Sequence, residues 1–164
     1  MKVSNYRALH NEANFGRPIV TQVSGGAHLT FEMITVQNGR FHMTRWPKGL
    51  PGHDDPPNVL RFPHGLIRFG ESLQNCARRL VKDQLGMAVK QVEVAYWDSY
   101  LDDMNHWHIE PGCIAHVVGK PIVPTGAAEI ITFDLSQIPE MTFWPRKDFL
   151  ELVRDQLPHL LKGR

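Results

Sequence analysis

The sequence predicts one domain that combines strands and helices in an α/β or α+β arrangement. The chain has 164 residues, 42% of them hydrophobic, which suits a single domain with its own core. Its patterned segments follow the order strands, loop, helix, strands, helix, and no linker or internal repeat divides residues 1–164. Two cysteines are too few for a disulfide framework, so we expect an intracellular chain with reduced thiols.

The first third of the chain has the pattern of strands and a hairpin. β-branched and aromatic residues recur over residues 18–23 and 29–36, as they do in strands. Asn38 and Gly39 lie between alternating apolar residues, and this dipeptide adopts the positive φ angles of a tight two-residue turn. Residues 47–58 contain four prolines and two glycines, which indicates a long loop.

Two helices are predicted by apolar periodicity. The clearer one spans residues 72–85, where apolar side chains recur at spacings of three and four and Gly86 supplies a stop. The other spans residues 146–157, after Pro145 and before Pro158, and carries one apolar stripe. Each helix is therefore expected to bury one face.

Three further strands are predicted in the second half of the chain, at residues 92–100, 107–118 and 129–133. Pro111 and Gly112 interrupt the second of them, and both residues weaken a strand interior. We therefore expect a bulge or bend at that point.

The charge balance excludes some classes of partner. Eighteen basic and seventeen acidic residues leave a net charge of +1, so no overall field favours nucleic acid or a membrane surface. Apolar stretches are far shorter than the ~20 residues of a membrane span, and the first residues lack an apolar signal region. We expect a soluble cytoplasmic protein with at most local affinity for phosphate.

Residues 62–87 read FPHGLIRFGESLQNCARRLVKDQLGM and resemble the signature of the Nudix hydrolases. Six residues fall on the family pattern at the right spacings: Gly65, Glu71, Arg79, Val81, Gly86 and Met87. The order of elements around the segment follows the family over nearly the whole chain. The resemblance implies an α/β/α sandwich with a mixed β-sheet, and hydrolysis of a nucleoside diphosphate derivative, such as a sugar nucleotide, with Mg²⁺ or Mn²⁺.

The signature helix normally carries three carboxylates at i, i+3 and i+4, on one helical face, where they hold divalent cations around a diphosphate. Here those positions are Leu80, Asp83 and Gln84, so one carboxylate remains. The resemblance implies a weak metal site formed by Asp83, Gln84, Glu129 and the backbone carbonyl of His64. The His64 side chain, which stands where the family has a second glycine, is a further candidate ligand. His64 is alternatively a tolerated substitution.

Leu80 replaces the glutamate that usually acts near the attacking water, so a base must come from elsewhere. The GDP-mannose mannosyl hydrolase branch also has leucine at this position and cleaves at the sugar carbon with a histidine as base. His106 and His108 face one side of a strand and are candidates for that role, with polar strand-end residues as the alternative.

Other polar residues have both a functional and an ordinary interpretation. Arg45 and Arg68 suit phosphate oxygens if the resemblance holds, and are otherwise surface arginines. The run His53, Asp54 and Asp55 in the long loop would present a histidine with an orienting carboxylate, or simply a solvated loop tip.

Two functions of different classes are therefore predicted. The first is a divergent Nudix-type hydrolase of a nucleoside diphosphate derivative. The second is a catalytically silent Nudix-fold module that binds a nucleotide-like small molecule or a protein partner. The depleted carboxylate face of the helix separates the two, and a homodimer is compatible with either.

Overall fold

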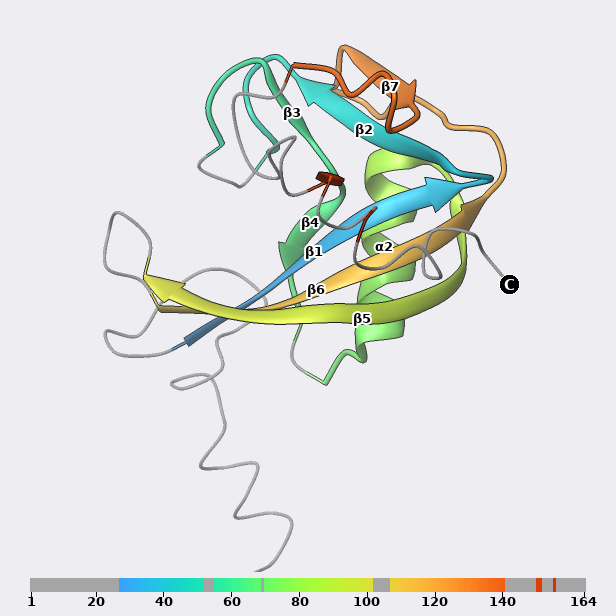
Figure 1. The fold of residues 1–164 in the computed structure, drawn as a ribbon. Coiled ribbons are helices and arrows are strands. Elements are labelled where there is room, and N and C mark those ends of the chain that lie inside the picture. The colour runs from blue at the N-terminus through green and yellow to red at the C-terminus, as the bar shows by residue number, and fades with distance from the viewer. Residues whose placement is uncertain are drawn as a thin grey trace, which may run out of the picture.

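The structure, a computed structural model, describes residues 27–51, 55–68, 70–101 and 107–140, together with Leu150, Glu151 and Asp155. The predicted strand at 18–23 and most of the predicted helix at 146–157 lie outside these residues. The elements, shown in Figure 1, are β1 (Ala27–Gln37), β2 (Arg40–Trp46), β3 (Val59–Arg61), β4 (His64–Leu66), α2 (Leu73–Leu85), β5 (Ala88–Leu101), β6 (Trp107–Val118) and β7 (Glu129–Phe133).

The strands form one mixed sheet, as predicted. Its order is β3-β2-β1-β6-β5, with β4 paired to β1 and β7 paired to β2. The central strands β1 and β6 run parallel, whereas the remaining pairs are antiparallel. Figure 1 shows α2 lying across one face of this sheet, with β5 at its edge. The α/β class expected from the sequence is confirmed.

The turn between β1 and β2 has the geometry that the sequence predicts. Gln37 pairs with Arg40, which leaves a loop of two residues. These are Asn38, with φ of 51°, and Gly39, with φ of 75°. Two successive positive φ angles are what a type I′ hairpin turn requires, and asparagine and glycine adopt them at least cost.

Both ends of α2 are fixed by their own residues. The Ser72 side chain accepts a hydrogen bond from the backbone N–H of Asn75 and caps the first turn. Gly86 closes the helix in the left-handed conformation, and its N–H donates to Lys82 O at 3.0 Å. A side chain at Gly86 would also place its Cβ 2.6 Å from the Cβ of Ile122, so only glycine fits.

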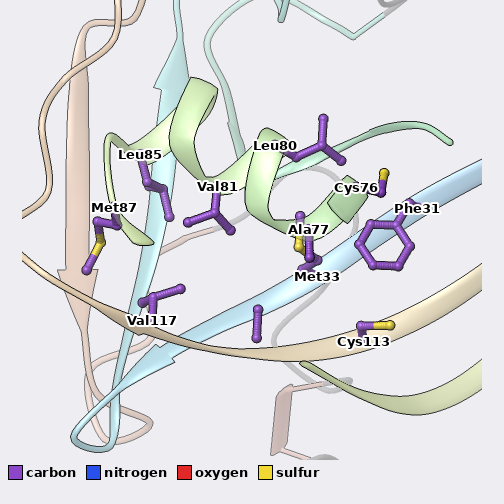
Figure 2. Close-up of a cluster of buried hydrophobic side chains, with 11 residues drawn as sticks. Phe31, Met33, Cys76, Ala77, Leu80, Val81, Leu85, Met87, Cys113 and Val117 are labelled. Atoms are coloured by element: carbon purple, nitrogen blue, oxygen red, sulfur yellow. The ribbon is translucent and has the colours of Figure 1, made fainter. Parts of the chain in front are cut away.

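A buried apolar cluster joins α2 to the sheet. Figure 2 shows Ala77, Val81 and Leu85 pointing from the helix toward the strands, while Leu80 leaves the helix in another direction. Leu80 is nevertheless buried in the same cluster. The other members are Phe31, Met33, Cys76, Met87, Cys113, Ala115 and Val117.

A second cluster covers the opposite face of the sheet. Side chains alternate along a strand, so Ile34 of β1 and Ile114 of β6 point away from α2. They pack with Phe62, Phe133 and the fully buried Leu150, a helical residue of the C-terminal segment. The sheet is thus packed on both faces, in agreement with the expected sandwich.

The two cysteine thiols are not suited to nucleophilic chemistry. Cys76 and Cys113 are free and buried, and burial raises the pKa of each thiol to about 12, so neither is a nucleophile at neutral pH. Among the helices of the described residues, none is long and apolar enough to span a membrane.

The bulge or bend expected at Pro111 and Gly112 is confirmed in place but not in strand. Val94 pairs with Cys113 and Tyr96 with Gly112, so the register shifts at this point and the extra residue lies in β5, while β6 continues through both residues. A Cβ on Gly112 would lie 1.9 Å from Cζ of Tyr96. The glycine therefore makes room for an aromatic ring from the neighbouring strand and does not bend its own.

Candidate functional site

Two residues of the signature segment, Glu71 and Arg79, hold the loop before α2 against the helix. Arg79 donates from Nε and Nη2 to the two Glu71 carboxylate oxygens, each at 2.8 Å, and from Nη2 to Leu66 O at 3.0 Å. The backbone N–H of Arg68 donates to the same carboxylate. The Arg79 guanidinium lowers the pKa of Glu71 to about 2, so the pair stays ionised. These residues form the scaffold of the segment.

The three helix positions that carry carboxylates in the Nudix signature have different surroundings here. Leu80 belongs to the apolar cluster under α2. Asp83 is exposed. Gln84 is only 6% exposed and lies between α2 and β4. The sequence leaves one carboxylate at these three positions, and the structure places the three side chains in different surroundings.

Gln84 is bound to a single peptide unit. Its Nε2 donates to His64 O at 2.7 Å, and its Oε1 accepts from the His64 N–H at 3.3 Å. The backbone carbonyl of Gln84 in turn accepts from Thr44 Oγ1 at 2.8 Å. The amide thus ties α2 to β4 and turns an N–H group toward the carbonyl that the sequence suggested as a metal ligand. A cation would need that carbonyl oxygen.

The predicted phosphate and metal residues on β2 and β7 neutralise each other. Arg45 and Glu129 are paired in the sheet register, and Arg45 Nε lies 2.8 Å from Glu129 Oε1. Arg45 also donates to Asn58 O at 3.4 Å. Arg68 is exposed in the loop that follows β4.

Of the four residues predicted to hold a metal, the structure therefore brings only His64 and Gln84 into contact. Within the described parts of the chain, no three His, Cys, Asp or Glu side chains gather as a metal site. In their place stand an amide paired to a peptide, an exposed Asp83 and an ion-paired Glu129. The described residues at these positions do not fit a Mg²⁺ or Mn²⁺ centre.

Polar residues gather instead on the face of the sheet opposite α2. His28, Thr30 and Glu32 alternate along β1 with residues that face the helix, and β6 contributes His108 and Glu110 to the same face. We call this surface the polar face. It consists of these strand residues and of the side chains that contact them: His28, Thr30, Glu32, Asp55, Arg61, His64, Tyr96, Tyr100, His108 and Glu110.

One part of the polar face is a network of buried charges. Arg61 lies 3.3 Å from Glu32 through Nη2 and 2.8 Å from Asp55 through Nη1. Asp55 Oδ2 lies 3.1 Å from His64 Nε2. All four side chains are less than a tenth exposed. Buried charges are costly to desolvate and give little net stability, so such a cluster marks a candidate functional site.

His64 shares a proton with Asp55. Its Nδ1 lies 2.9 Å from Phe62 O, and because a carbonyl only accepts, Nδ1 donates. The second hydrogen bond therefore places one proton between Nε2 and the Asp55 carboxylate. Burial and the Arg61 charge lower the pKa of His64, while Asp55 opposes that shift.

Asp55 also corrects the interpretation of the long loop. The solvated loop tip is the wrong alternative for Asp55, because its carboxylate is buried between Arg61 and His64. The loop is thus anchored to β3 and β4 through this side chain. His53 and Asp54 lie outside the described residues.

The other part of the polar face centres on Glu110. Its Oε2 accepts from Thr30 Oγ1 at 3.0 Å and from the Tyr100 hydroxyl at 3.4 Å. Burial raises the pKa of Glu110. The Tyr100 ring stacks on His108, with centroids 4.9 Å apart and planes at 3°, and His28 meets His108 edge-on at 4.9 Å. A carboxyl and a row of rings thus lie side by side.

Comparisons with known proteins place this arrangement among solved folds. No protein-family model matches the chain, and no curated protein matches it in sequence. Among solved structures, the MutT Nudix hydrolase of Burkholderia pseudomallei superposes with a TM-score of 0.63 at 18% identity, covering 77% of this chain and 98% of the other. The chain has the Nudix fold.

Two further structures extend this likeness over nearly the full chain. The Nudix domain of Shewanella oneidensis NrtR, in complex with ADP-ribose, has a TM-score of 0.65 at 13% identity and covers 98% of this chain and 99% of its own. A MutT/Nudix family protein of Enterococcus faecalis has a TM-score of 0.62 at 16% identity, covering 99% and 73%.

The Nudix fold brings some predicted site residues together and leaves others apart. His64 and Gln84 touch, and His108 lies on the polar face, whereas His106 lies outside the described residues. Sequence reasoning missed Glu32, Arg61, Tyr100 and Glu110. A signal for two of them was present, because polar residues alternate with apolar ones at 28–33 and 107–110, the pattern of a strand with one polar face.

Proposed function

We propose that this Nudix-fold chain binds a nucleoside diphosphate derivative on its polar face and does not hydrolyse it through a metal held by the signature helix. The observation that carries the proposal is the Gln84 amide, which is paired to the His64 peptide where metal chemistry would need free oxygens. The ADP-ribose bound by the similarly folded NrtR domain supports the class of ligand.

The position of Leu80 adds to this proposal. Its side chain is 4% exposed inside an apolar cluster, so it offers no group to a reacting water. A glutamate introduced there would bury a carboxylate without a partner, at a cost of several kcal/mol. The side chain at position 80 therefore packs in the core and takes no part in chemistry.

Arg45 and Arg68 remain our candidates for contacts to phosphate. A guanidinium is a cation whose planar fork matches two phosphate oxygens. Arg68 is exposed beside α2, whereas Arg45 would have to exchange its contact with Glu129 for a ligand phosphate.

A second candidate function is hydrolysis of a sugar nucleotide at the sugar carbon, with His108 as the base. It is favoured by the position of His108 on the same face as Glu110, because a histidine beside a carboxyl of raised pKa is a usable acid–base pair. His106 is the alternative base. Hydrolysis in ¹⁸O-labelled water would place the label in the sugar if this function holds, and in the phosphate if attack is at phosphorus.

The proposed function is tested by calorimetric titration of the wild-type protein with ADP-ribose and with GDP-mannose, in EDTA and in excess Mg²⁺, with mass analysis of each ligand afterwards. We expect the same affinity in both buffers and an intact ligand. Asp83→Asn is the matched control, because it alters the one carboxylate left in the signature helix. Mg²⁺-dependent turnover that Asp83→Asn abolishes would contradict the proposal and restore the metal-dependent hydrolase.

A further inference from the structure

The rings of the polar face form a row across three neighbouring strands. Tyr100 pairs with His108 between β5 and β6, and His108 pairs with His28 between β6 and β1. The Tyr100 and His108 rings are parallel within 3°, and the His28 ring meets His108 edge-on. Tyr100 is at the end of this row, on the edge strand β5, and it is 40% exposed. The row thus ends in a flat, accessible ring of fixed orientation.

The same face also holds the carboxyl of Glu110, and the described residues hydrogen-bond to only one of its two oxygens. Glu110 is 8% exposed, and both of its hydrogen bonds, from Thr30 and Tyr100, reach Oε2. No described residue donates to Oε1. Burial raises the pKa of Tyr100 to about 12, so its hydroxyl remains a donor at neutral pH and holds the carboxyl in place.

The charges near these residues disfavour phosphate at this end of the face. Among the described residues around Tyr100, the charged side chains of β1, β5 and β6 are Glu32, Asp98 and Glu110, all acidic. Arg61 is bound by Glu32 and Asp55. An uncharged group that stacks on a ring and donates a hydrogen bond to a carboxyl suits this place better than a diphosphate. A nucleobase with an exocyclic amino group has both properties.

We propose that Tyr100 and Glu110 form the subsite for the base of the ligand, in which an amino-bearing purine such as adenine stacks on Tyr100 and donates to Glu110 Oε1. This inference rests on the proposed function, since it assigns one end of the same ligand. It also places the diphosphate away from the acidic end of the polar face, toward the side of β4.

The experiment is calorimetric titration of wild type and variants with ADP-ribose, adenosine, inosine and ribose 5-phosphate. Tyr100→Leu should weaken ADP-ribose and adenosine roughly 5- to 100-fold, the range for loss of one base-stacking ring. Tyr100→Phe keeps the ring and should retain most of the affinity. Glu110→Gln can turn an N–H toward the ligand, so it should reduce a preference for adenosine over inosine by about tenfold.

Trp97→Leu is the matched control, because Trp97 is a 63% exposed aromatic residue on the other face of β5. It should leave all four affinities unchanged. Thermal unfolding establishes that each variant is folded, and if Tyr100→Leu is not, the adenosine-to-inosine preference of Glu110→Gln decides.

Three results would overturn the subsite. ADP-ribose affinity equal in wild type and Tyr100→Leu would remove it while leaving the proposed function intact. An equal loss for ribose 5-phosphate would show that Tyr100 contacts the sugar end. Failure of all four ligands to bind wild type would remove the proposed function together with the subsite, whereas adenosine binding that depends on Tyr100 without any diphosphate binding would retain the subsite alone.

Discussion

The Gln84→Glu variant tests the feature on which the proposed function depends. The substitution keeps an acceptor for the His64 N–H but removes the N–H that donates to His64 O at 2.7 Å. It also places a carboxylate against that carbonyl at a position only 6% exposed. A buried acceptor without a donor costs ~1–3 kcal/mol, and a buried charge adds to it, so we expect a loss of about 2–5 kcal/mol at pH 8.

The pH dependence gives the sign of the effect. Burial beside a carbonyl raises the folded-state pKa of the introduced carboxyl, so the protonated form is favoured and can again donate to His64 O. The loss should therefore be largest above that pKa and shrink as the pH falls to about 5. For a domain of this size, the change corresponds to a fall in Tm of ~5–20 °C at pH 8, which differential scanning calorimetry measures.

The control is Gln74→Glu, the same chemical change at an exposed position of α2. It should alter the free energy of unfolding by under ~0.5 kcal/mol at either pH. If Gln84→Glu were as stable at pH 8 as Gln74→Glu, the amide would not be bound to the His64 peptide, and the argument against a metal at this position would fail.

Three further predictions concern other contacts of the described residues. Burial raises the pKa of Glu110, so the stability it contributes is present at low pH and lost as the pH rises through that value; Glu110→Gln should have the higher Tm at pH 8, and the gap should close near pH 4. Arg79→Lys loses the bidentate hydrogen bonds to Glu71, and urea unfolding should show a free energy of unfolding lower by ~1–3 kcal/mol. Arg45→Ala breaks an exposed ion pair, so stability should change by less than ~1 kcal/mol. A clear fall in ADP-ribose affinity for Arg45→Ala would identify a phosphate contact, and unchanged affinity would exclude one.

Local rules account for the parts of the fold that were predicted correctly. The hairpin follows from the backbone preferences of Asn38 and Gly39, and α2 follows from its apolar spacing between Ser72 and Gly86. Each of these signals lies within a few residues of the element that it specifies. The mixed sheet was expected from the resemblance of the segment at 62–87, which no local rule supplies, and its strand order is known only from the structure.

The site depended on contacts between distant residues, and sequence spacing does not report these. From the sequence Asp55 is a loop residue, and only the structure shows its partners Arg61 and His64. From the sequence Gln84 is a weak metal ligand, and only the structure shows that its amide is bound to the His64 peptide. The sequence predicts a bulge or bend at Gly112, although the role of this glycine is set by a ring on another strand. In each case the deciding partner is absent from the local pattern.

The contact between Tyr96 and Gly112 constrains the order in which these two positions can change during evolution. Any side chain at 112 would occupy space held by the Tyr96 ring, so a first substitution there must displace the ring. A small residue at 96 removes the obstacle and makes the same substitution tolerable. The two changes should therefore be strongly non-additive in a double-mutant cycle. Descendants of this chain with a side chain at position 112 should already have lost the ring at position 96.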